Sequence, residues 1–393
     1  MKNNITTIKN CSGCFLCEIL CPKQCISKMK NNNGFFTPVV SEARCVECGL
    51  CLNVCPCTQK TGNKPIKIFG ARNKNSEVLK KSTSGGAFTA VSDWVVSNNG
   101  IVFGAVFNDD FDVVHTYATN FEQRDKMRGA KYVKSDITEV YSRLEKFLSK
   151  GLNVLFCGTP CQVAAIKSFC VFKKLPVEKL VTIDLICHGT PSPVIFADYL
   201  KILQKKFGKL VSYTFRDKTI GWHGQNVTAV FENGKRMSKG FVKHFSTLYF
   251  RSYITMESCQ SCKYASMIRN GDLTLGDFWG VEKYYKAFSD EKGVSLVMVN
   301  TDKGMDIFNK AKSNLEYWST DENKCMQMNL MMPSSPNIHK NVFFGAYHAF
   351  GFSFAYHLTN VYQFIDILLS KFMAIIKVFK TIKIKSKLGG SEK

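Results

Sequence analysis

The chain has 393 residues, 45% of them hydrophobic, and a formal net charge of +22. This length allows about two or three domains, and the apolar content excludes a chain too polar to bury a core. The basic residues are scattered and no nucleic-acid-binding module is visible, so we predict no nucleic-acid partner. An acidic redox partner, an anionic cofactor or a lipid surface fits the charge better.

The seventeen cysteines indicate the compartment. The first ten residues are polar and contain no apolar run, so no signal peptide is expected. Many cysteines without a secretion signal favour a reducing compartment and metal ligation over disulfides. We therefore expect a cytoplasmic protein.

Residues 11–56 contain the same cysteine pattern twice, C-x2-C-x2-C-x3-C-P. This is the spacing of bacterial ferredoxins with two [4Fe-4S] clusters, in which the fourth cysteine of each run binds the other cluster. Zinc sites use separated C-x2-C pairs, and a disulfide framework does not suit a reducing compartment. The first predicted ligand set is Cys11, Cys14, Cys17 and Cys55; the second is Cys45, Cys48, Cys51 and Cys21.

The rest of the N-terminal part completes an α+β ferredoxin-like module over residues 1–62. A turn at 31–34 precedes an expected strand at 35–40, and the polar stretch 61–65 is the expected domain boundary. The cysteines without a predicted cluster role are interpreted as buried free thiols. They are Cys25, Cys57, Cys157, Cys170 and Cys325.

Beyond residue 66 the pattern is that of an α/β domain. Strands are expected at 66–71, 101–107 and 113–119, and helices at 87–97 and 137–149. Two continuous apolar strands, 152–156 and 180–186, are each followed by a helix, which indicates a mainly parallel sheet buried on both faces. Further strands are expected at 211–215, 227–231, 273–275 and 294–299, with a hairpin turn at Asn233-Gly234.

A third cysteine set comes from three separate segments. Cys161 lies at the start of a helix, Cys187 follows the next strand, and Cys259 and Cys262 have C-x2-C spacing. Because ligands bind at the carboxyl ends of parallel strands, these thiols can converge on one iron–sulfur or zinc site. A redox pair at 259/262 with unrelated thiols elsewhere remains open, and Cys157 is the substitute for Cys161. His188 is a ligand, a proton donor or a structural hydrogen-bonding group.

Two glycine-containing helix starts can hold a pyrophosphate through free backbone N–H groups. One is Ser84-Gly85-Gly86 and the other is Gly158-Thr159. Lys131 can add a counter-charge and Tyr132 a stacking surface.

The C-terminal stretch 358–393 has apolar residues at helical spacing, interleaved with lysines such as Lys371, Lys377 and Lys380. Its apolar runs are too short to span a membrane. The pattern fits a basic amphipathic helix on an anionic inner membrane surface and fits equally a terminal helix packed on the main domain.

Six motifs in this order resemble the beta-subunit family of coenzyme F420 hydrogenases and dehydrogenases over residues 1 to about 320. They are residues 82–86, 131–133, 158–162, 187–189, 259–262 and 276–280. The resemblance implies an FAD-binding domain at 66–357, with FAD near Ser84, Gly85, Gly86, Lys131, Tyr132, Gly158 and Thr159. It also implies a third [4Fe-4S] cluster on Cys161, Cys187, Cys259 and Cys262.

The resemblance further implies an iron–sulfur flavoprotein oxidoreductase that couples hydride transfer at FAD, from a reduced deazaflavin of the F420 type, to one-electron transfer through the clusters. The expected partner is a redox protein or a deazaflavin or ferredoxin donor. One alternative is a ferredoxin-dependent reductase of an organic substrate, linked by analogy to polysaccharide biosynthesis. The other is a non-enzymatic electron-carrier subunit.

Overall fold

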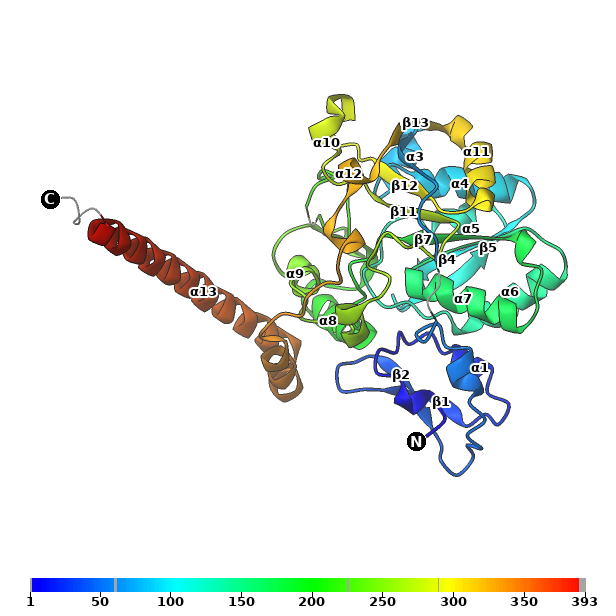
Figure 1. Cartoon of the computed structure of the whole chain (residues 1–393), viewed down its shortest axis with the longest axis horizontal. Coiled ribbons are helices and arrows are strands. Elements are labelled where there is room, and N and C mark those ends of the chain that lie inside the picture. Colours follow the sequence, from blue (N-terminus) through cyan, green and yellow to red (C-terminus); the bar gives the residue numbers. More distant parts are fainter. Residues whose placement is uncertain (1, 60–61, 225, 289, 389–393) are drawn as a thin grey trace. The chain divides into compact units, whose positions relative to one another are not determined.

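The computed structural model describes residues 2–59, 62–224, 226–288 and 290–388, and the side chains of 370–388 lie outside this description. The chain divides into two compact units, Met1–Ser335 and Pro336–Lys393 (Figure 1).

The N-terminal part of the first unit contains a hairpin and short helical turns. Strands β1 (Ile26–Lys30) and β2 (Phe36–Val40) pair antiparallel, with Ile26 opposite Val40. Gly34 closes the turn at a φ of 73°, which a residue without Cβ adopts readily. The expected strand at 35–40 is thus confirmed, whereas its lysine-rich partner β1 was not predicted. The cysteine runs carry the helical turns α1 (Leu16–Ile19) and α2 (Leu50–Asn53), and the turn η1 (Ile5–Thr7) precedes the first run.

An eight-stranded mixed sheet forms the centre of the unit, in the order β13-β3-β12-β11-β7-β6-β4-β5. The predicted pair of apolar strands is confirmed, since β6 and β7 run parallel with Val154 opposite Leu180. Strands β4, β6, β7 and β11 form the parallel centre, and the outer strands join antiparallel. The strands are β3 (Lys67–Asn73), β4 (Ile101–Phe107), β5 (Val113–Ala118), β6 (Val154–Gly158), β7 (Leu180–Leu185), β11 (Leu273–Asp277), β12 (Ser295–Val299) and β13 (Leu315–Thr320).

Helices cover both faces of this sheet. On one face α4 (Ala87–Ser97) and α11 (Asp302–Ala311) share an apolar core with the strands. On the other, α6 (Thr138–Ser149) and α7 (Pro160–Phe172) share a core that also takes in Leu16 and Leu20. The N-terminal cysteine segment therefore packs on the α6–α7 layer. Shorter helices are α3 (Ser76–Lys81), α5 (Phe121–Asp125), α10 (Val281–Tyr284) and α12 (Glu322–Cys325).

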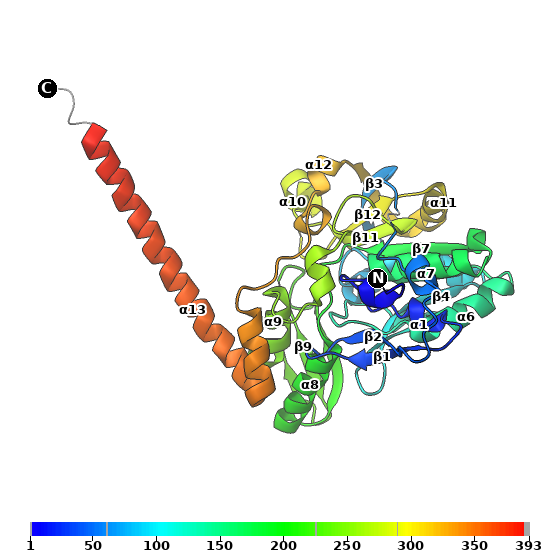
Figure 2. The same ribbon diagram turned by 60° about the horizontal axis from the view of Figure 1, so that its bottom comes forward.

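Two of the expected strands belong to a separate antiparallel sheet of β8 (Leu210–Thr214), β9 (Thr228–Phe231) and β10 (Arg236–Met237). The hairpin predicted at Asn233-Gly234 is confirmed between β9 and β10. Helices α8 (Pro193–Phe207) and α9 (His244–Phe250) lie beside this sheet (Figure 2). Helix α8 packs on the sheet through the ring pair Phe196–Tyr213 at 5.5 Å, and it packs on α9 through the pair Phe196–Phe245 at 4.8 Å. The remaining short turns are η2 (Val177–Lys179), η3 (Gly240–Lys243), η4 (Glu257–Ser261), η5 (Lys286–Phe288), η6 (Lys312–Asn314) and η7 (Met328–Leu330).

A buried ion pair fixes the loop that precedes β11. Arg269 donates to the Asp184 carboxylate at 2.8 Å, and both side chains are fully buried. The other Asp184 oxygen accepts from the backbone N–H groups of Asn270 and Gly271 at 2.9 and 2.8 Å. Because every charge has a partner, the loop that follows Cys259 and Cys262 is held firmly against β7.

The second unit contains one helical element, α13 (Lys340–Leu388), interrupted at Gly351 by a non-helical φ of 79°. The expected C-terminal helix is confirmed as far as Leu388, and it begins well before residue 358. The lysines expected on its polar face, from Lys371 onward, lie outside the described side chains. None of the helices in the described part of the chain combines the length and apolar character needed to cross a bilayer.

Candidate functional site

The first ligand set lies mostly inside the protein. Cys14, Cys17 and Cys55 are buried, and Cys11 is half-buried. Cys14 interacts electrostatically with Cys11, and Cys55 with Cys14. Burial raises the pKa of the Cys14 thiol to about 12. The structure thus brings the fourth cysteine of the second run to the first run, as the ferredoxin spacing predicts.

The second set lines one small cavity. Cys45, Cys48 and Cys51 of the second run share its wall with Cys21 of the first run. This is the crossed arrangement expected from the sequence. Cys48 is exposed, so this set reaches the protein surface.

Two thiols without a predicted role lie against these sets. The Cys25 sulfur is 3.4 Å from that of Cys21, and Cys25 lines the same cavity. Cys57 shares a hydrogen bond with Cys55 and interacts electrostatically with Cys11 and Cys14. Each set therefore has a fifth cysteine beside it. Neither thiol belongs to the C-x2-C-x2-C-x3-C pattern, so spacing could not assign them.

The third set also converges. Cys161 is the second residue of α7, Cys187 follows β7, Cys259 lies in η4, and Cys262 follows η4. Cys187 interacts electrostatically with the other three thiols, and those three interact with one another. Backbone and hydroxyl groups face the sulfurs: the Gly189 N–H lies 3.4 Å from Cys187, and the Thr190 hydroxyl 3.8 Å from Cys259.

All seventeen cysteines are free thiols. Among the described residues, no three His, Cys, Asp or Glu side chains are close enough together to bind a single metal ion.

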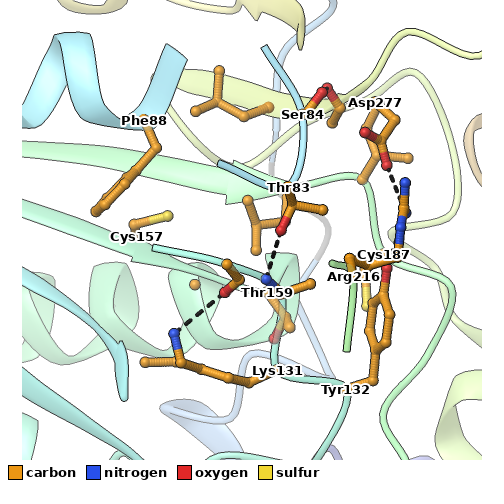
Figure 3. A pocket seen from close by; sticks show the side chains of 18 of the residues that line it. Thr83, Ser84, Phe88, Lys131, Tyr132, Cys157, Thr159, Cys187, Arg216 and Asp277 are labelled. Carbon is orange, nitrogen blue, oxygen red and sulfur yellow. Dashed lines mark hydrogen bonds and ion pairs between the residues drawn. The ribbon is translucent and has the colours of Figure 1, made fainter. Parts of the chain in front are cut away.

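A cavity of about 380 Å³ opens beside the third set. It lies at the carboxyl ends of the parallel strands, where open α/β sheets bind ligands. Six of the seven residues predicted to hold FAD line it, namely Ser84, Gly86, Lys131, Tyr132, Gly158 and Thr159. Cys187 lines it as well, so one residue belongs both to the cavity and to the third cysteine set (Figure 3).

Gly85 is the predicted residue that does not line the cavity. A Cβ at this position would lie 2.2 Å from the Ala71 carbonyl oxygen and 2.4 Å from the Ser295 nitrogen. Gly85 is therefore required for close packing against β3 and β12. Its neighbour Gly86 has a φ of 82° and caps the N-terminus of α4 at the cavity wall.

Lys131 faces backbone carbonyls. Its ammonium group donates to the carbonyl oxygens of Lys126, Arg128 and Gly129 at 3.1, 2.9 and 3.2 Å. Burial lowers the pKa of this lysine to about 8. The predicted counter-charge is present at the cavity wall, but the loop 126–129 already uses its hydrogen-bond donors.

Tyr132 packs its ring among other aromatic side chains. Its centroid lies 5.1 Å from that of Tyr249 and 5.3 Å from that of Phe250. Its hydroxyl accepts a hydrogen bond from Arg216 at 3.4 Å. Tyr132 thus stiffens the cavity wall beside Cys187.

Arg216 and Asp277 form an ion pair at 3.1 Å in the cavity wall (Figure 3). Asp277 also accepts from the indole N–H of Trp222 at 2.9 Å. The Arg216 guanidinium lies 5.2 Å from the ring of Trp279. The sequence placed Asp277 in a family motif, but it gave no signal for Arg216, which comes from the loop after β8.

Two histidines line the cavity. The Nδ1 of His188 lies 3.0 Å from the Ser334 hydroxyl and 3.3 Å from the Asn329 amide oxygen, whereas its buried Nε2 has no hydrogen-bond partner among the described residues. His115, which the sequence analysis did not select, is buried and has its Nε2 3.0 Å from the Cys157 carbonyl oxygen. His115 is a single histidine within a predicted strand, and no neighbouring residue forms a recognisable motif with it. The sequence therefore could not indicate that it lines a cavity.

The segment 262–264 connects the third set to the first. Lys263 donates to the carbonyl oxygens of Pro56 and Cys57 at 2.6 and 3.3 Å, and Tyr264 donates to that of Pro56 at 3.3 Å. Cys11 and Cys161 also interact electrostatically across this junction.

Comparison with protein families gives two matches. Residues 10–58 match the 4Fe-4S dicluster domain, and residues 151–324 match the C terminus of the coenzyme F420 hydrogenase/dehydrogenase beta subunit. Comparison with curated proteins gives no match. Among solved structures, the chain is similar to one from the F420-reducing [NiFe] hydrogenase complex of Methanosarcina barkeri. That match has 20% identity and a TM-score of 0.47, and it covers 68% of this chain and 85% of the other. The chain is therefore related to the coenzyme F420 hydrogenase/dehydrogenase beta subunit over residues 151–324, and it is an iron–sulfur protein of oxidoreductase type with a match to a 4Fe-4S dicluster domain at residues 10–58.

Proposed function

We propose that this chain is an iron–sulfur flavoprotein oxidoreductase in which FAD binds in the 380 Å³ cavity and exchanges electrons with three [4Fe-4S] clusters. One observation carries the proposal: Cys187 lines the cavity and is also a member of the third cysteine set. A cofactor in this cavity therefore adjoins a cluster ligand.

The donor sets fit iron–sulfur clusters. Each of the three sets consists of four thiols, which are the ligands that [4Fe-4S] clusters use. Burial raises the pKa of Cys14 and of Cys262 to about 12, so these thiols hold their protons until iron displaces them. The N–H groups around the sulfurs can hydrogen-bond to a bound cluster and tune its potential.

The cavity fits a dinucleotide. The N-termini of α4, with 11 residues, and α7, with 13, both meet it at Gly86 and Gly158. Unpaired N–H groups at helix starts bind pyrophosphate, although at α7 the Thr159 N–H already donates to the Gln162 side chain. When bound, FAD would accept or donate a hydride and pass electrons singly to the clusters.

The chain's own residues orient the cofactor and shape its surroundings. The Arg216–Asp277 pair, Tyr132 and Trp279 form the wall beside Cys187. No side chain needs to act as a nucleophile. The proposed hydride donor is a reduced deazaflavin of the F420 type.

The contacts between the cysteine sets support an order of electron transfer. Lys263 and Tyr264 connect the third set with the first, and Cys17 of the first set interacts electrostatically with Cys51 of the second. The second set ends at the exposed Cys48. We therefore propose that a redox partner protein docks beside Cys48, where a cluster lies nearest to the solvent.

The test uses the full chain, reconstituted anaerobically with iron, sulfide and FAD. The proposal expects flavin absorbance together with about twelve irons per chain, four for each set. Bleaching of the flavin by reduced deazaflavin, NAD(P)H or reduced ferredoxin then identifies the donor. Bleaching by ferredoxin alone would favour the reductase of an organic substrate, and clusters without bound flavin would favour the electron carrier.

For the second unit we propose contact with an anionic membrane surface. Phe364 and Leu368 are 62% and 51% exposed on α13. In the sequence, Asp366 is the single acidic residue between 340 and 388, and six lysines follow it from Lys371 to Lys387. An apolar helix with a lysine-rich continuation binds anionic lipid headgroups.

Liposome flotation tests this contact. The full chain should float with anionic vesicles and float poorly with zwitterionic ones. A chain ending at residue 360 and the double variant F364E/L368E should both remain in solution. Equal flotation of the full and shortened chains would remove the membrane proposal and would leave the redox proposal unaffected. A cytoplasmic location, peripheral on the inner face of the membrane, follows from the same proposal.

A further inference from the structure

The cavity has two distinct ends (Figure 3). Cys187, Tyr132, Arg216 and Asp277 lie at one end, and Phe88 and Cys157 lie at the other. Thr83, Lys131 and Thr159 lie between them. A long ligand therefore has an end beside the third cysteine set and an end remote from it.

At the remote end His115 presents an unused nitrogen. Its side chain is only 6% exposed, and its ring stacks on Phe156 with centroids 5.4 Å apart and planes 17° apart. Its Nε2 lies 3.0 Å from the Cys157 carbonyl oxygen. A carbonyl can only accept, so Nε2 carries the hydrogen and Nδ1 carries a lone pair. Among the described residues, this Nδ1 has no hydrogen-bond partner.

A buried acceptor without a partner is costly, so a ligand that supplies a donor gains affinity there. Burial lowers the pKa of His115 to about 4, so the ring is neutral at physiological pH and keeps its lone pair. The site at Nδ1 therefore selects a donor group on the ligand and rejects an acceptor.

The proposed function determines which end of FAD lies at which end of the cavity. If FAD passes electrons to a cluster on the third set, its isoalloxazine ring lies at the Cys187 end. The adenosine half then reaches the end formed by Phe88, His115 and Cys157. The only N–H donor of the adenine base is its exocyclic amino group, whereas hypoxanthine has a carbonyl oxygen at that position.

Resting on this function, we propose that His115 accepts a hydrogen bond from the adenine amino group of FAD through Nδ1, and that this contact makes the site specific for adenine. Phe88 lines the same end and offers an aromatic ring beside the base. His115 is thus a specificity-determining residue for the cofactor and has no part in the redox step.

The experiment compares three flavins on the full, cluster-loaded chain freed of flavin. They are FAD, its hypoxanthine analogue and FMN, and binding is measured by quenching of flavin fluorescence. The wild-type protein should bind FAD about tenfold or more tightly than the analogue, because the analogue sets an oxygen lone pair against that of Nδ1. In His115→Phe, which keeps an aromatic ring but loses the acceptor, this ratio should fall to about one.

FMN affinity reports on the rest of the site and should be the same in both proteins. His115→Asn, whose amide oxygen replaces the acceptor, should restore part of the discrimination. His348→Phe is the matched control, since His348 is exposed in the second unit and should behave as wild type.

The outcomes separate this proposal from the function on which it depends. Equal affinity of the wild-type protein for FAD and the analogue would overturn it, and this result needs no variant to fold. An equal loss of affinity for FAD and for its hypoxanthine analogue in His115→Phe would also overturn it, because His115 would then contact a ribose hydroxyl or another group that both ligands share. A wild-type protein that binds none of the three flavins would overturn the proposed function itself.

Discussion

Lys263 donates a hydrogen bond to the carbonyl oxygen of Pro56 at 2.6 Å, and these two residues each follow a cysteine directly. Pro56 follows Cys55 of the first set, and Lys263 follows Cys262 of the third. The contact holds together two cysteine sets that lie about 200 residues apart in the sequence. It is therefore a structural link in the proposed route of electrons.

Removing the Lys263 contact should destabilise the packing between the first and third cysteine sets without loss of cofactors. Lys263→Met loses the hydrogen bonds to the carbonyl oxygens of Pro56 and Cys57. Because Lys263 is exposed, we expect a loss of only about 1–2 kcal/mol in the free energy of unfolding, with iron content unchanged. Urea titration followed by circular dichroism measures the effect. Lys150→Met, at another exposed lysine, is the control, and equal unfolding midpoints for the two variants would show that the link contributes nothing.

The short distance between Cys21 and Cys25 predicts a substitute ligand. With the two sulfurs 3.4 Å apart, Cys25 can take over in Cys21→Ser, and the variant should keep its full iron content. The double variant C21S/C25S should lose about four irons per chain. Iron and acid-labile sulfide analysis measures both. Cys170→Ser, at a buried thiol outside all three sets, should not change the count. Loss of a cluster in the single variant would contradict this prediction.

Substitution by alanine should reduce the stability of the protein more at Gly85 than at Gly129. Gly85→Ala places a methyl group 2.2 Å from a backbone oxygen, and we expect a loss of about 3 kcal/mol in stability from overpacking. Gly129 has a φ of 82° with no atom within 4 Å of the added Cβ, so Gly129→Ala should cost about 1 kcal/mol through backbone strain alone. Chemical denaturation of both variants measures the two losses of stability. A larger loss in Gly129→Ala than in Gly85→Ala would contradict the prediction.

His115 should make the protein less stable in mild acid. The unfolded imidazole takes up a proton near its ordinary pKa of about 6.5, whereas the buried ring does so only near a pKa of about 4. Unfolding therefore becomes more favourable as the pH falls from 7.5 to 5, by about 1–2 kcal/mol. His115→Phe should lack this part of the pH dependence. Urea unfolding at both pH values checks the difference, and parallel curves for the two proteins would contradict it.

The sequence determined the local chemistry of this protein. The repeated cysteine spacing alone predicted which thiol joins which set, because four cysteines within eleven residues leave few arrangements around a cluster. The two apolar strands at 152–156 and 180–186 predicted the parallel centre of the sheet, since strands buried on both faces need continuous apolar side chains.

Features that depend on contacts between distant segments could be found only in the tertiary structure. It brought Cys25 and Cys57 beside the cluster sets, assigned Gly85 to packing, and placed Arg216 and His115 in the cavity wall. None of these positions has a local signature, because each depends on which segment lies opposite after folding. Spacing along the chain specifies ligands that come from one loop, whereas a cavity is built by strands and loops that meet only when the sheet has formed.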